Sequence, residues 1–391
     1  MAKKLSLPHI LFIFMLTSFV LGEVARIQFP SGIAVKALDL AVLMFIVGSA
    51  LSFRKKFKKP ILTKPILLFL LVASTSLFIN YPSLKVEELA VSLSYLVRWI
   101  AYAGIYFLVT NFDKDIKNKI PSYLLYMGGA VIGIGFLQYF FYPNLRNLYY
   151  LGWDEHLYRL FSTFLDPNFA GAFFVLYFLF TLGFFIKYRK PTYGIFSFMA
   201  AVAIILTFSR SAYLMLFVGL VTFLWMTGKM KLIVVFILFF TLITLVLSLA
   251  GLRSEGTNLL RTTSTVARLD TARSAVVIFE NNPILGVGFN AYEYASKRYG
   301  LVEESRYDNH SAAGTDNSVL FILATVGIVG FAAYLYLWFK ILLFARSRKG
   351  MYSIVLLSSL ASLSVGSLFI NSLFYTFIML WMWVLLGLFE D

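Results

Sequence analysis

The longest polar stretch of this chain runs from Arg253 to Asn317 and holds several side chains that could do chemistry. Arg268 stands in the segment A-R-L-D-T-A, and Asp316 comes just before the end of the stretch. A further arginine, Arg210, lies in the tight turn T-F-S-R-S-A-Y between two apolar runs. A guanidinium group offers a planar pair of donors that matches a phosphate, and a carboxylate can accept a proton. These residue types favour chemistry on an anionic substrate over a purely accessory loop.

The rest of the composition is that of an integral membrane protein. Of the 391 residues, 60% are hydrophobic and only 14% are charged, and the mean hydropathy is +0.82. Apolar runs of about 20 residues recur along the chain, as bilayer-spanning helices require. We therefore predict one all-α polytopic domain over 1–391, with about twelve transmembrane helices at 7–24, 33–52, 61–79, 87–110, 121–142, 168–187, 192–208, 211–227, 232–251, 317–340, 352–370 and 371–389.

The net charge of +15 lies mostly in short basic clusters between the apolar runs. When the crossings are counted, the clusters all fall on one side of the membrane; they lie at 3–4, 54–59, 114–119, 187–190, 229–231 and 346–349. Cytoplasmic loops carry such an excess of Lys and Arg, so both termini are predicted to be cytoplasmic. The long loops 143–167 and 252–316 then lie outside. This distribution indicates a membrane topology and no nucleic-acid partner.

The chain offers few ligands for a metal. It has no cysteine and three histidines, which are too few for a histidine-built metal site and exclude disulfide and thiolate chemistry. Carboxylates remain the alternative ligands. We expect neither a metal nor another cofactor.

Four motifs follow one another around the long outer loop. They are S-T-F-L-D-P-N-F-A at 162–170, T-F-S-R-S at 207–211, A-R-L-D-T-A with F-E-N-N-P-I-L-G-V-G over 267–288, and D-N-S-V-L-F-I-L-A-T-V-G-I-V-G at 316–330. In this order they resemble the O-antigen ligase and O-antigen polymerase family of bacterial membrane glycosyltransferases. The resemblance covers about residues 90–345.

The resemblance implies a GT-C type enzyme of the bacterial inner membrane with its active site on the extracytoplasmic side. Such an enzyme moves a glycan from a polyprenyl-pyrophosphate carrier, such as undecaprenyl pyrophosphate, to a hydroxyl acceptor, with inversion and without metal. The implied partners are the carrier-linked donor, a glycan or lipid-core acceptor and membrane lipids, with a chain-length regulator protein as a further candidate. By the same resemblance, Arg210 and Arg268 would bind the pyrophosphate.

Each of these arginines also has a plain structural interpretation. Arg210 lies at outer membrane depth, where a charge is costly, so it either binds substrate or snorkels to lipid headgroups. Arg268 lies on a predicted helix that Ser264 or Thr265 caps, and there the alternative is a solvated polar face. Arg273 lies on an adjacent face of that helix and has the same two interpretations.

The chain departs from the ligase pattern where the last outer loop enters the next span. Ligases of the family usually carry a His-Asn pair there, whereas this chain has Asp316-Asn317. Asp316 is either a catalytic base with a raised pKa or the N-cap of the following helix. His310 is the second candidate for the base, and its alternative is a solvated loop residue.

The Asp-Asn form resembles polymerases more than ligases, so we predict an enzyme that joins repeat units of a surface polysaccharide such as that of lipopolysaccharide. A ligase that moves finished glycan to a lipid core or a protein is the alternative within the class. A flippase for lipid-linked oligosaccharide is the alternative of another class. A transporter would be expected to show helices broken at mid-depth in two related halves, and the sequence indicates none.

Other polar residues complete the predicted site. Asn168 and Asn317, which directly follow the two long outer loops, are predicted to contact the substrate, as is Arg159 within the first of these loops. Arg98 in the fourth predicted span and Asp39 in the second are expected to pair, either as a structural element or as part of the substrate site.

Overall fold

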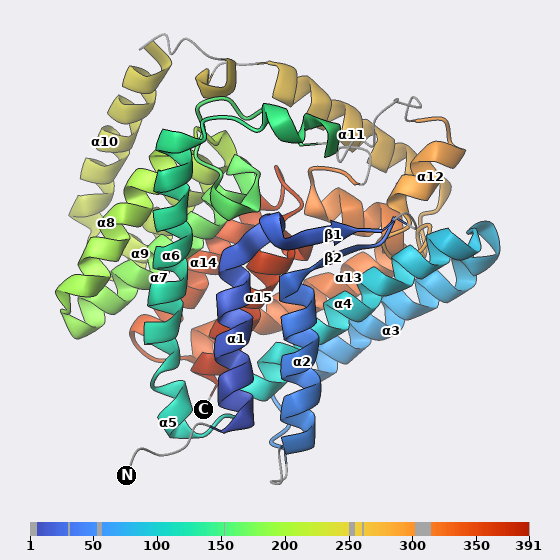
Figure 1. The fold of residues 1–391 in the computed structure, drawn as a ribbon, viewed down its shortest axis with the longest axis horizontal. Helices are drawn as coiled ribbons and strands as arrows, with labels where there is room; N and C mark the ends of the chain where they lie inside the picture. Colours follow the sequence, from blue (N-terminus) through green and yellow to red (C-terminus); the bar gives the residue numbers. More distant parts are fainter. Residues whose placement is uncertain are drawn as a thin grey trace.

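The computed structural model describes residues 6–29, 32–52, 57–151, 153–249, 255–259, 262–301 and 314–390. Most of them form helices (Figure 1): α1 (Leu7–Leu21), α2 (Ala37–Ser52), α3 (Thr63–Asn80), α4 (Val86–Thr110), α5 (Lys114–Lys117), α6 (Ile120–Phe141), α7 (Pro167–Tyr188), α8 (Pro191–Leu206), α9 (Arg210–Met226), α10 (Met230–Leu249), α11 (Thr263–Asn281), α12 (Tyr292–Arg298), α13 (Ser318–Ser347), α14 (Met351–Gly366) and α15 (Thr376–Phe389). A short antiparallel pair of strands, β1 (Arg26–Gln28) and β2 (Ala34–Lys36), joins α1 to α2.

Many of these helices are apolar enough for a membrane. Within the described residues, 6 helical segments are also long enough to cross one: Leu7–Ala25, Thr63–Ser83, Val86–Thr110, Lys114–Phe141, Pro167–Tyr188 and Ser318–Ser347. The shorter apolar helices are Ala37–Ser52, Pro191–Leu206, Arg210–Met226, Met230–Leu242, Met351–Gly366 and Thr376–Phe389. The all-α, multi-pass membrane class is thereby confirmed, and the count of twelve spans stays a prediction.

The loops that the sequence assigns to the cytoplasm meet at one end of the bundle. The backbone amide of Ile61 donates to the Glu390 carboxylate at 2.8 Å, and the Lys117 ammonium donates to the Glu390 carbonyl at 2.6 Å. Arg348 donates to the carbonyl of Phe389 at 3.3 Å. Figure 1 shows α5 and the start of α1 near the lower edge, whereas α11 and α12 lie at the upper edge. This separation supports the predicted topology, while the orientation in the membrane stays a prediction.

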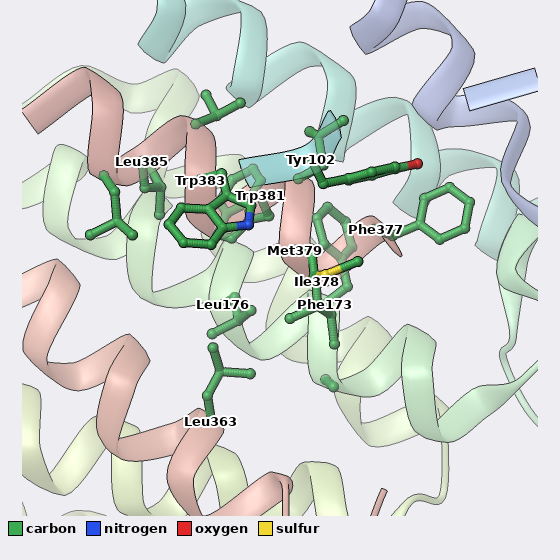
Figure 2. Close-up of a cluster of buried hydrophobic side chains, with 14 of the residues drawn as sticks. Tyr102, Phe173, Leu176, Leu363, Phe377, Ile378, Met379, Trp381, Trp383 and Leu385 are labelled. Atoms are coloured by element: carbon green, nitrogen blue, oxygen red, sulfur yellow. The ribbon is translucent and has the colours of Figure 1, made fainter. Parts of the chain in front are cut away.

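Helix α15 lies in the centre of the bundle and is apolar on all sides, as a helix enclosed by others must be. Trp381 is fully buried and its ring packs edge-on against Phe173 at 5.4 Å and Phe180 at 5.3 Å, both from α7. Figure 2 shows Trp381 among Phe173, Leu176 and other apolar side chains. This packing fixes α15 against α7 in the core of the bundle.

The predicted ion pair between Arg98 and Asp39 is confirmed. The guanidinium lies 3.0 Å from the carboxylate, and the side chains are 10% and 9% exposed. The carboxylate also accepts from the Tyr102 hydroxyl at 2.9 Å and from the backbone amide of Lys36 at 3.0 Å. Arg98 further donates to the carbonyl of Ala34. With these partners the pair is a closed structural unit between the first turn of α2 and the middle of α4.

Lys36 lies next to this pair and is buried as well. Its location near the outer end of a predicted span suggests that the ammonium snorkels to the surface, but this expectation is wrong. The ammonium pairs with buried Glu23 at 2.6 Å and donates to the Thr376 hydroxyl at 3.0 Å. Glu23 lies in the turn before β1, so the hairpin folds it back onto Lys36 and supplies the counter-charge.

Helix α13 is interrupted at Gly327, which has a φ of 66°. The segment P-I-L-G-V-G at 283–288 fills the break. The amide of Ile328 donates to the carbonyl of Pro283 at 2.9 Å. A Cβ at Gly327 would lie 2.3 Å from the carbonyl oxygen of Ile284, so a glycine is required there. The end of α11 is thereby fixed to α13, and the two helices carry neighbouring parts of one site.

Candidate active site

The turn between α8 and α9 places Arg210 at the first position of α9. The hydroxyl of Ser209 is the N-cap and accepts from the amide of Ala212 at 3.4 Å. Phe208, just before it, has a φ of 47°, a conformation that costs a non-glycine residue about 1–2 kcal/mol. Arg210 is therefore presented by a tight and strained turn at the upper end of the bundle.

Helix α11 brings a second arginine to Arg210. The guanidinium of Arg210 donates to the Thr265 hydroxyl at 3.1 Å, and Arg268 acts on it as a neighbouring positive charge. The predicted helix is confirmed, but the predicted caps are wrong. Thr262 holds the N-cap position without a side-chain bond, and Ser264 and Thr265 lie inside α11. Thr265 contacts Arg210 instead.

Asp316 completes the cluster from the entrance to α13. Its carboxylate lies 3.6 Å from the Arg268 guanidinium. The alternative interpretation of Asp316 as the helix N-cap is wrong, because Asn317 takes that role. The Asn317 side-chain oxygen accepts from the amides of Val319 at 2.9 Å and Leu320 at 3.0 Å. The carboxylate of Asp316 is therefore not used for capping.

The cluster surrounds a cavity of about 440 Å³. Its polar lining is formed by Arg210, Ser211, Thr265, Arg268, Asp316 and Asn317, and its apolar lining by Leu214, Leu269, Ala272, Leu368 and Phe369. Two cations and one carboxylate therefore face the same space as a wall of aliphatic and aromatic side chains. Such a lining suits an amphipathic anion, with its charge on the arginines and its apolar part against the wall.

The environment of Asp316 changes its acidity. Partial burial raises the pKa of the carboxyl above its ordinary value, the Arg268 cation opposes the rise, and the nearby charges of Asp166 and Asp154 add to it. The side chain is still 52% exposed, so water in the cavity reaches it while the protein walls reduce its hydration. A carboxylate with a raised pKa is a better proton acceptor than an ordinary one.

The end of the outer loop 143–167 lies behind the turn that carries Arg210. Arg159 is buried and donates to the carbonyls of Thr207 at 2.8 Å and Phe208 at 3.4 Å. Asn168 accepts from Arg159 at 3.4 Å and from the Ser209 hydroxyl at 2.9 Å. The contacts of these two predicted substrate ligands support the turn, and neither residue is among those that line the cavity.

Carboxylates from the same outer loop lie near the site. Burial raises the pKa of Asp154, the charge of Asp166 raises it further, and Arg159 lowers it. The Asp166 carboxylate caps α7, accepting from the amides of Asn168 at 2.6 Å and Phe169 at 3.3 Å. Within the described residues, no group of three or more His, Cys, Asp or Glu side chains could hold a metal ion.

The remaining predicted site residues lie elsewhere. Arg273 is 78% exposed and pairs with Asp270 at 3.2 Å on α11, so the structure places it on the surface of that helix and not in the cavity lining. Arg98 belongs to the closed pair with Asp39. His310 lies outside the described residues. Of the predicted ligands, Arg210, Arg268, Asp316 and Asn317 come together.

Sequence reasoning missed the apolar wall and Thr265 as a partner of Arg210. Leu368 and Phe369 belong to a predicted span at 352–370, but α14 ends at Gly366 and these side chains leave the helix to line the cavity. No pattern in the sequence marks this early end. The available signal for the apolar wall was Leu269, an apolar residue that directly follows Arg268 in the sequence and lines the same cavity.

Residues 195–335 match the family model described as O-Antigen ligase. Over this segment the chain is similar to the O-antigen ligase family. The segment contains Arg210, Arg268 and Asp316, so the resemblance expected from the motifs is confirmed over the part of the chain that carries the charged residues of the cavity. The match indicates a glycosyltransferase-like enzyme and, with the apolar helices, a multi-pass membrane protein. A search of curated proteins found no match to this chain.

Proposed function

We propose that this protein transfers a polyprenyl-pyrophosphate-linked glycan to a sugar hydroxyl and thereby polymerises the repeat units of a surface polysaccharide. The observation that carries the proposal is the convergence of Arg210 and Arg268 with Asp316 around one cavity. The arginines come from α9 and α11, and Asp316 from the entrance to α13, so the fold assembles the cluster from three segments.

In the proposed reaction, the acceptor oxygen attacks the anomeric carbon of the donor glycan. The bond between that carbon and the pyrophosphate oxygen breaks, and the electron pair leaves with the carrier pyrophosphate. Arg210 and Arg268 stabilise the negative charge that grows on this leaving group. Asp316 accepts the proton of the attacking hydroxyl, for which its raised pKa suits it. Attack opposite to the leaving group inverts the anomeric configuration.

The apolar wall supports a lipid-linked donor over a soluble sugar nucleotide. Leu214, Leu269, Leu368 and Phe369 line the same cavity as the two arginines. A carrier lipid would place its pyrophosphate at the guanidinium groups and its first isoprene units against this wall. A nucleotide would instead need polar partners for its base and ribose, and these apolar side chains offer none.

The matched family model is described as a ligase, and this description favours ligation as the alternative to polymerisation. A ligase would use the same donor and the same arginines but would need a lipid-core or protein acceptor. Asp316 in place of the histidine that ligases usually carry favours the polymerase. The flippase alternative has less support, because the polar side chains of the cavity gather at one end of the bundle.

The test uses purified protein in detergent with a polyprenyl-pyrophosphate-linked repeat unit as the only substrate, and the products are resolved by size. A ladder of longer glycans on the carrier would establish a polymerase. Transfer that begins only when a lipid-core or peptide acceptor is added would make the protein a ligase. No transfer to any acceptor, together with movement of the lipid across liposomes, would contradict the proposal in favour of a flippase.

A further inference from the structure

Arg159 lies in the outer loop 143–167, yet the residue is only 5% exposed. Its Nε donates to the carbonyl of Thr207 at 2.8 Å, and its Nη2 donates to the carbonyl of Phe208 at 3.4 Å. The next residue, Leu160, donates its amide to the carbonyl of Leu206 at 2.9 Å. Three successive carbonyls at the end of α8 are therefore bonded by two neighbouring residues of the outer loop.

A helix end leaves such carbonyls without partners inside the helix, and the helix dipole makes this end negative. A buried arginine next to these carbonyls donates hydrogen bonds to them, and its positive charge balances the negative end of the helix dipole. It also holds Phe208 in the left-handed conformation that turns the chain toward Arg210. The contact therefore acts on the shape of the turn.

The outer loop itself is held firmly at this point. Gln138 of α6 donates to the carbonyl of Arg159 at 3.3 Å. Its side-chain oxygen accepts from the amides of Phe161 at 2.9 Å and Ser162 at 3.1 Å. Arg159 is thus attached to α6 on one side and reaches the α8–α9 turn on the other.

A second connection reaches the start of α9. Asn168 accepts from Arg159 at 3.4 Å and from the hydroxyl of Ser209 at 2.9 Å. The same hydroxyl accepts from the amide of Ala212 in the first turn of α9. Arg159 and Asn168 therefore fix both residues that precede Arg210 in the chain.

We propose that Arg159 is a positioning residue that sets the geometry of Arg210, through the carbonyls of Thr207 and Phe208 and through Asn168. This inference rests on the proposed role of Arg210 in binding the pyrophosphate, and it replaces the expected contact of Arg159 with a sugar. A lysine keeps the charge but offers one compact ammonium in place of the planar fork that bonds these separate acceptors.

The test is a double-mutant cycle on the transfer reaction. Arg159→Lys is measured in the wild-type background and in the Arg210→Ala background, with initial rates at saturating donor. We expect a loss of at least about tenfold in the wild-type background and of no more than about twofold in the Arg210→Ala background, because a residue that acts through Arg210 has nothing left to position. The matched control is Arg146→Ala, which removes an exposed arginine of the same loop that pairs with Glu155.

Equal losses in both backgrounds would overturn the inference, because Arg159 would then act on the substrate or on folding independently of Arg210. Full activity of Arg159→Lys would overturn it as well. If this variant does not fold, Asn168→Leu takes its place in the same cycle, because it removes the acceptor shared by Arg159 and Ser209. Full activity of Arg210→Ala would instead refute the proposed function, so the two failures are distinguishable.

Discussion

Two regions of the bundle combine arginine or lysine with carboxylates, and they differ in how the charges are matched. In the first region, Arg98 pairs with Asp39 and Lys36 pairs with Glu23. All four side chains are 10% exposed or less, and hydroxyls or backbone groups form further hydrogen bonds with Lys36, Asp39 and Arg98. The charges of these four side chains cancel, and little of their surface is open to water.

In the second region, Arg210 and Arg268 share a cavity with Asp316. The Arg268 side chain is 21% exposed and that of Asp316 is 52% exposed, and the cavity leaves space beside them. The lining therefore carries more positive than negative charge and can accept an anion. The first region therefore stabilises the fold, whereas the second has the open, net positive lining that the proposed function requires.

The largest expected effect concerns the closed region. Replacing Arg98 by alanine leaves the Asp39 carboxylate buried without its cation, which costs roughly 3–5 kcal/mol of stability. We expect the variant to unfold at a clearly lower temperature in detergent, or not to accumulate in the membrane. If an Arg98→Ala protein melts like the wild type but has lost transfer activity, the pair of Arg98 and Asp39 belongs to the substrate site. The distinction between a structural region and a substrate region would then be wrong.

The second prediction concerns the cavity. Arg210→Ala and Arg268→Ala should each lower the transfer rate by about 10²–10³-fold, as the removal of a group that stabilises a leaving charge does elsewhere. Their melting temperatures should stay close to that of the wild type, because both side chains border a cavity. Arg273→Ala, on the same helix as Arg268 but paired at the surface, is the matched control and should retain nearly full activity.

The third prediction separates the neighbours Asp316 and Asn317. Asn317→Ala removes the N-cap of α13 and should lower stability by about 1 kcal/mol. Asp316→Asn should leave the melting temperature unchanged and abolish most of the transfer, because the variant cannot accept the proton. If Asp316→Asn is instead destabilised but active, Asp316 has a structural role and is not the base.

The smallest expected effect is a shift in the pH dependence. The base works in its ionised form, so the rate should rise with pH through the pKa of Asp316, and this limb should lie above the ordinary value of 3.8. Since the Arg268 cation lowers this pKa, Arg268→Gln should move the limb of the residual activity to higher pH. A limb that does not move in this variant would assign the base to another group.

Some of this arrangement could be predicted from the sequence. Charges inside apolar runs are rare and need partners, so the pairing of Arg98 with Asp39 followed directly. The joint role of Arg210 and Arg268 followed from the family resemblance, and Asp316 was indicated by its position where the last outer loop enters the next span. The pairing of Lys36 with Glu23 could not be foreseen, because it depends on how the β1–β2 hairpin folds back.

Other features depend on packing between segments that are distant in the chain. Arginine is a common residue in anion-binding sites, so the sequence favoured a substrate contact for Arg159. Its contacts with the α8–α9 turn follow only from its burial against the end of α8. The early end of α14, which sends Phe369 into the cavity lining, lies within an apolar run that predicts an unbroken helix. Residue types therefore indicated the chemistry, whereas the walls and supports of the site required the three-dimensional structure.

The most direct measurement of the central claim is the binding of a polyprenyl pyrophosphate to purified wild type, Arg268→Ala and Arg273→Ala in detergent. These variants remove one arginine each from the same helix, one at the cavity and one at the surface. Binding at least about tenfold weaker for Arg268→Ala, with Arg273→Ala like the wild type, is the predicted result, because the loss of one charge-assisted contact is worth about 1.5–3 kcal/mol. Equal binding by all three proteins would contradict the assignment of this cavity to the pyrophosphate.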